Sequence, residues 1–139
     1  MNRFLLVLTL ALTGCANLAI DSLDALRSRN RENISTLSVG MTGEDVTRIM
    51  GTDSAGGKLG DIFFGRMRYL QATNPYRIED VRGADGENYQ VRFYYTDVKH
   101  LDDAITDDEL TPVVLLDDKI VGVGYDFLRA RAPQYRADR

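Results

Sequence analysis

The chain has 139 residues, with 21 acidic and 17 basic side chains, a formal net charge of -4 and a single cysteine. Such an acidic chain suits neither nucleic acid nor anionic lipid headgroups, and one cysteine excludes both an internal disulfide and a CxxC metal or redox site. Without the export signal expected at its N-terminus, about 125 residues remain, enough for one small domain and not for two.

The N-terminal segment has the layout of a secretory signal. Arg3 supplies one positive charge, and residues 4–12 form an apolar run that contains one hydroxyl side chain. This run is well under the ~20 residues that a helix needs to cross a hydrocarbon core. We therefore expect an export signal over residues 1–14 and no stable membrane span.

The end of this segment resembles a lipobox. Leu12 lies three positions before Cys15, and small residues separate the two. The resemblance implies that the Cys15 thiol receives diacylglycerol, that the chain is cut before it, and that the new amino group is acylated. A free thiol after an ordinary signal is the alternative, and it is disfavoured because the only cysteine stands where lipidation requires it. Several acyl chains would hold the protein on a bilayer essentially permanently.

The residue after the cysteine bears on location. Ala16 follows Cys15, and by similarity to enterobacterial sorting rules, in which Asp at that position favours the inner membrane, we expect the outer membrane with the protein facing the periplasm. Removal of residues 1–14 deletes one basic and no acidic side chain, which leaves a net charge near -5. Membrane contact is therefore expected through the acyl chains and not through electrostatics.

The mature chain divides into a tether and a domain. Residues 15–30 are polar and charged with few apolar positions, so we expect a lipidated tether that runs into a helix, followed by one domain over residues 31–139. A first short helix is expected around 31–37. Thr42 can cap a second helix, and Gly51 stands where a left-handed C-terminal cap is expected. The buried stripe of this second helix is expected at Val46, Ile49 and Met50.

Downstream, the apolar period changes to two, which indicates strands. The expected strands are 76–82, 89–95, 113–116 and 120–125, with turns at 83–86 and 117–119. Three or four antiparallel strands therefore follow two helices, an α+β fold. The segment 61–70 fits either a helix or a strand, and both readings stay open.

The segment 39–51 resembles the helix signature of the BamE (SmpA/OmlA) lipoprotein superfamily: Gly-Met-Thr, then a Val, then a small helix that ends in Gly. The second half, with Asn-Pro-Tyr-Arg at 74–77 and Lys-Ile-Val-Gly-Val-Gly at 119–124, is more similar to a neighbouring family of uncharacterised envelope lipoproteins. The resemblance covers roughly residues 31–127. It departs from BamE in a lengthened region at 56–70 and in the residue after Gly-Thr, which is Asp.

This resemblance implies two short helices packed on one face of a three-stranded antiparallel sheet. BamE is an accessory subunit of the machine that inserts β-barrels into the outer membrane, but the fold is reused by lipoproteins and inhibitors of unrelated role. We therefore expect a binding or assembly-scaffold module in cell-envelope or outer-membrane protein biogenesis, with an envelope protein as partner. The alternative is an inhibitor or ligand-sensing lipoprotein that uses its sheet face. The resemblance carries over no partner-binding residue.

Residues for catalysis or metal binding are scarce. His100 is expected to be a solvated loop residue, and no nucleophile, phosphate-loop or dinucleotide motif occurs, so we expect no enzyme and no cofactor. The acidic stretch does not match an EF-hand loop, so a solvated acidic loop is favoured over a calcium site. Its carboxylates are Asp97, Asp102, Asp103, Asp107, Asp108 and Glu109.

Three residues are candidates for contact with a partner. Gly122 and Gly124 share one face of the last expected strand, where small residues allow another backbone to approach closely. A helix of the same chain on that face is the favoured explanation, and strand addition by a partner is the alternative. Tyr94 points away from Tyr95 in the alternating pattern and is expected to be the exposed aromatic of its strand.

Overall fold

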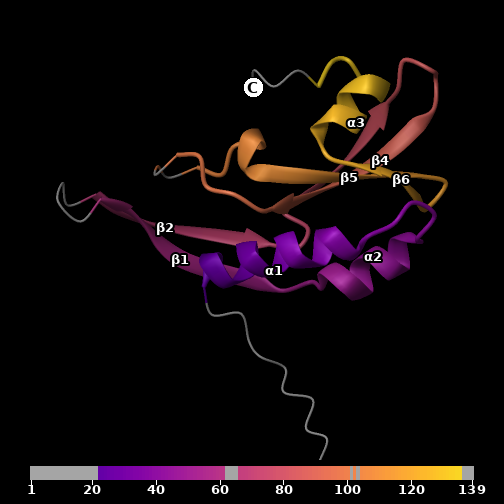
Figure 1. The fold of residues 1–139 in the computed structure, drawn as a ribbon. Helices are drawn as coiled ribbons and strands as arrows, with labels where there is room; N and C mark the ends of the chain where they lie inside the picture. The colour runs from indigo at the N-terminus through magenta and orange to yellow at the C-terminus, as the bar shows by residue number, and fades with distance from the viewer. Residues whose placement is uncertain (1–21, 62–65, 101, 103, 136–139) are drawn as a thin grey trace, which may run out of the picture.

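The computed structural model describes residues 22–61, 66–100, 102 and 104–135 (Figure 1). The expected signal and Cys15 lie outside this part of the chain. The elements are α1 (Leu23–Thr36), α2 (Gly43–Met50), β1 (Ser54–Asp61), β2 (Arg66–Thr73), β3 (Arg77–Arg82), β4 (Asn88–Tyr95), η1 (Asp107–Glu109), β5 (Leu110–Leu116), β6 (Lys119–Val123) and α3 (Tyr125–Arg131). None of the described helices is long and apolar enough to span a membrane.

Four strands form one antiparallel sheet in the order β3-β4-β5-β6, and β1 and β2 form a separate antiparallel hairpin. In Figure 1, α1 and α2 lie on one side of the four-stranded sheet, and α3 lies on the other. This confirms the expected α+β class, with antiparallel strands after two helices. The third helix was not expected: Gly124 has a φ of +90°, so the chain leaves β6 there and α3 starts at Tyr125.

The second helix forms for the local reasons that the sequence indicates. The Thr42 hydroxyl accepts the Asp45 backbone N–H at 3.1 Å, and the Asp45 carboxylate accepts the Thr42 backbone N–H at 3.1 Å, which completes a capping box. Gly51 ends the helix with a φ of +72°. The apolar face of α2 buries Val46 and Met50 in a cluster with Tyr94, Val113, Leu115 and Ile120.

The segment 61–70, for which helix and strand were both open, forms a strand wherever the structure describes it. β1 and β2 pair antiparallel over eight positions, with Ala55 opposite Ala72. Both alanines are buried against Leu23 and Leu26 of α1, whereas Tyr69 on the opposite face is 70% exposed. A two-stranded hairpin is marginal by itself, so its packing on α1 is what keeps it folded.

The first helix begins earlier than the sequence predicts. Ser22 caps it by accepting the Ala25 backbone N–H at 3.1 Å, and Leu23, Leu26 and Asn30 are buried in the domain. The tether expected over 15–30 is therefore wrong in its second half, because residues 23–30 belong to the folded domain. The charged side chains of this segment, of which only Arg27 is largely covered, obscure a buried face of only three residues.

Candidate functional site

The three candidate contact residues offer little free surface. Tyr94 is only 1% exposed, so the expectation that it is exposed is wrong: it does point away from the Tyr95 face, but α2 covers the face that it joins. Gly122 is covered by α3, because a Cβ atom built on it would lie 2.2 Å from Cγ of Phe127. Gly124 serves as the residue before α3. The explanation of a helix from the same chain is therefore confirmed for Gly122.

The acidic stretch is organised by one buried carboxylate. Glu109 is 1% exposed, and its Oε1 accepts the backbone N–H groups of Lys99 at 2.7 Å and His100 at 3.1 Å. Its Oε2 accepts the backbone N–H of Thr106 at 3.1 Å. Three main-chain donors thus satisfy a charge that would be costly to bury alone. Glu109 has a structural role that its place in an acidic cluster did not reveal.

The other groups of this loop that the structure describes do not come together as a catalytic or metal site, and Asp103 lies outside the described residues. His100 is 59% exposed, and its Nε2 lies 3.5 Å from Oδ2 of Asp108 at the surface. A general base needs an ordered hydrogen bond and a pocket, and this pair has neither. Within the described part of the chain, no three His, Cys, Asp or Glu side chains converge closely enough to hold a metal ion.

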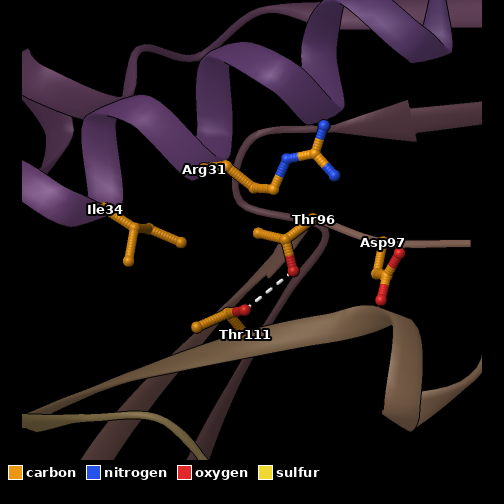
Figure 2. A pocket seen from close by; sticks show the side chains of 5 residues that line it. All are labelled: Arg31, Ile34, Thr96, Asp97 and Thr111. Carbon is orange, nitrogen blue, oxygen red and sulfur yellow. Dashed lines mark hydrogen bonds between the residues drawn. The ribbon is translucent and has the colours of Figure 1, made fainter.

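A cavity of about 250 Å³, open to solvent, lies where α1 passes the end of β4 and the start of β5. In Figure 2, Thr96 and Thr111 lie between Ile34 on one side and Asp97 on the other, and the guanidinium of Arg31 lies above them. The lining residues are Arg31, Ile34, Thr96, Asp97 and Thr111. This cavity is the candidate functional site, because it brings cationic, anionic, hydroxyl and apolar groups together.

Helix α1 and strand β5 position three of these side chains, and the loop after β4 positions Thr96 and Asp97. Arg31 and Ile34 are three residues apart on α1, so they share one face of the helix. Thr111 lies on β5 opposite Tyr94, and Thr96 follows β4, where its backbone N–H donates to the Glu109 carbonyl at 3.0 Å. The two threonine hydroxyls are 2.7 Å apart and share a hydrogen bond across the floor of the cavity.

The positive charges at the rim of the cavity outnumber the negative ones. Asp97 has a lowered pKa, because Lys99 donates to its carboxylate, the backbone N–H of Val98 donates to it at 2.9 Å, and the Arg31 guanidinium lies in its field. Lys99 in turn has a raised pKa through the same pair. Asp97 and Lys99 therefore neutralise each other, and Arg31 is left as the additional positive charge at the site.

Sequence reasoning identified only Asp97 of this set, and only as part of a solvated acidic loop. The five lining residues come from segments up to 80 positions apart, between residues 31 and 111, so no local motif marks them. Only the packing of α1 across the strand ends brings them together. Comparison of the chain with models of protein families, with curated proteins and with solved structures finds no match.

Proposed function

We propose that this protein is a lipid-anchored envelope lipoprotein that faces the periplasm from the outer membrane and acts as a binding or assembly-scaffold module in envelope biogenesis. The observation that carries the proposal is the position of the expected lipid site directly before a folded domain. Cys15 follows a signal-like segment, and α1 begins at Leu23. A lipidated cysteine next to a small domain is the arrangement of a membrane-tethered binding module.

The early start of α1 sharpens this proposal. Only residues 16–22 separate the lipid site from the helix, and a chain of this length spans at most about 25 Å when fully extended. The domain would therefore stay close to the bilayer, and its partner would have to meet it there. The BamE-like resemblance supports the same proposal, since two helices on an antiparallel sheet are compatible with the observed arrangement.

A non-enzymatic role completes the proposal. The one histidine is an exposed loop residue, and the buried Glu109 carboxylate is occupied by three backbone donors. Neither group is in a position to move a proton on a bound substrate.

The test is labelling and fractionation of cells that express the full chain. We expect labelled palmitate to enter the wild-type protein and not Cys15→Ser, and we expect only the wild type to remain with outer membranes after a high-salt wash. Crosslinking in cells followed by pull-down of the tagged protein should recover an envelope protein. A wild-type protein that is unlabelled and released by salt would refute the anchor, and a labelled protein without any crosslinked envelope partner would refute the scaffold role.

A ligand-sensing lipoprotein is the second candidate, and the cavity between α1 and β5 favours it. The site is small and combines charged and hydroxyl groups with apolar surface, which suits a small ligand or the end of a peptide better than a flat protein surface. In this case the lipid anchor would place a sensor, and not a scaffold, at the membrane.

A further inference from the structure

We propose that the cavity beside α1 binds a monocarboxylate, either a free short-chain organic acid or the C-terminal carboxylate of a peptide. Arg31 would pair with the carboxylate, the threonine floor would donate one hydrogen bond, and Ile34 would contact the aliphatic part. The inference rests on the ligand-sensing function proposed for this cavity and is independent of the lipid anchor.

Arg31 carries a charge without a partner among the described residues. None of the ion pairs or side-chain hydrogen bonds among the described residues involves Arg31, although its neighbours Arg27 and Arg29 on the same helix pair with Asp24 and Asp53. A guanidinium presents a planar fork of N–H donors that matches a carboxylate in a bidentate pair. The site therefore has an unused cation of the geometry that carboxylates prefer.

The hydroxyl groups of the cavity floor can supply a donor. Thr96 and Thr111 together carry two hydroxyl hydrogens, and their mutual bond of 2.7 Å uses one of them. The only other acceptor for them among the described residues is the Glu109 carbonyl, 3.5 Å from the Thr96 hydroxyl, at the outer limit for a hydrogen bond. If Thr96 donates to Thr111, the Thr111 hydrogen is available to a carboxylate oxygen in the cavity.

The volume and the charges of the cavity limit the size and charge of a ligand. A volume of about 250 Å³ holds about eight water-sized groups at ~30 Å³ each, which fits one short acid or one terminal residue. Asp97 and Ile34 lie on opposite sides of the threonine pair in Figure 2. Asp97 is already balanced by Lys99, so Arg31 supplies one further positive charge, and Ile34 offers apolar contact. A monocarboxylate with a short aliphatic group therefore matches the site better than phosphate or a dicarboxylate, whose second negative charge would meet no further cation among the lining residues.

The test is a calorimetric or NMR titration of the full-length chain in non-ionic detergent. We expect propionate or N-acetylalanine to bind with a Kd of about 1 mM, an ordinary affinity for so small a ligand, and we expect no binding of propionamide or N-acetylalanine amide. Tighter binding of N-acetylalanine than of propionate would identify a peptide terminus, and the reverse would identify a free acid. Equal binding of acids and amides, tighter binding of inorganic phosphate, or no binding of either acid would overturn the proposal.

Variants link the binding to this cavity. Arg31→Gln should weaken carboxylate binding about tenfold or more, as loss of a charged hydrogen bond predicts, and Arg31→Lys should retain part of the affinity. Arg29→Gln is the matched control on the same helix, because Arg29 pairs with Asp53 at 3.0 Å and does not line the cavity. An unchanged Kd in Arg31→Gln, with an unchanged melting temperature, would overturn the assignment. Loss of palmitate labelling in Cys15→Ser is measured separately, so failure of the anchor and failure of the ligand site are distinguishable.

Discussion

The side-chain amides of Asn30 and Asn74 hydrogen-bond each other in both directions. Nδ2 of Asn30 lies 3.0 Å from Oδ1 of Asn74, and Nδ2 of Asn74 lies 2.7 Å from Oδ1 of Asn30. Each amide also donates to a carbonyl, that of Tyr95 at 2.8 Å for Asn30 and that of Met50 at 2.8 Å for Asn74. Both side chains are buried, so this pair joins α1, the end of α2, the segment after β2 and the end of β4 through satisfied polar groups.

We predict that Asn74→Ala lowers the free energy of unfolding by about 2–4 kcal/mol, because the buried Asn30 amide keeps only its bond to the Tyr95 carbonyl and the Met50 carbonyl loses the Asn74 donor. The double variant Asn30→Ala/Asn74→Ala should cost less than the sum of the two single changes, since each single change already breaks the pair. Urea unfolding monitored by circular dichroism measures all three. Asn88→Ala, at an exposed position of β4, is the control, and strictly additive costs would contradict the paired arrangement.

We predict that Gly122→Ala destabilises the protein by about 1–3 kcal/mol, the usual cost of overpacking. Its Cβ would lie 2.2 Å from the Phe127 ring, which α3 holds in place. Gly56→Ala is the matched control: its Cβ would meet the Tyr69 hydroxyl at 2.0 Å, but Tyr69 is exposed and can move aside. Combining Gly122→Ala with Phe127→Leu should recover part of the loss. Equal effects of the two glycine changes on the melting temperature would count against a fixed position of α3.

We predict that Glu109→Gln costs about 1.5–3 kcal/mol, although the change is nearly isosteric. Both carboxylate oxygens accept backbone N–H groups, and a glutamine can present an oxygen to only one side. Hydrogen exchange should therefore accelerate at the amides of Lys99, His100 or Thr106. Asp108→Asn is the control at an exposed neighbouring position, and unchanged exchange in Glu109→Gln would show that the carboxylate does not organise this loop.

The sequence predicts α2 closely because every signal for it is local: a cap at Thr42, an apolar stripe and a terminal glycine. It fails at the start of α1 because one third of the buried face is Asn30, whose burial depends on Asn74, 44 positions away. Alternation gives the orientation of Tyr94 correctly but not its exposure, since helices cover both faces of the sheet and both faces are therefore apolar.

The candidate site was less predictable than the fold. Its cation is one of several arginines on a helix with mixed charges, and only the ion pairs of Arg27 and Arg29 distinguish Arg31 from its neighbours. Its threonines lie at a strand end and within a strand, where a hydroxyl has no characteristic spacing. The pairing of β4 with β5 and the path of α1 are long-range features, and a pocket that depends on both leaves no pattern in a single sequence.

The capping box predicts an acid dependence of stability. Donation by Arg48, by the Thr42 backbone N–H and by the Thr42 hydroxyl lowers the pKa of Asp45 below its ordinary value of 3.8. Because the folded pKa lies below the unfolded one, the stabilisation is fully present above pH 3.8 and is lost as the pH falls through the folded value. Asp45→Asn keeps an oxygen acceptor but does not titrate.

The wild type should therefore be more stable than Asp45→Asn at pH 5, and the difference should shrink steadily on acidification below pH 3.8. Thermal unfolding across this range measures it, with Asp80→Asn, at an exposed position of β3, as the control. If the difference in stability between the wild type and Asp45→Asn did not change with pH, the helix cap would not favour the charged form of Asp45.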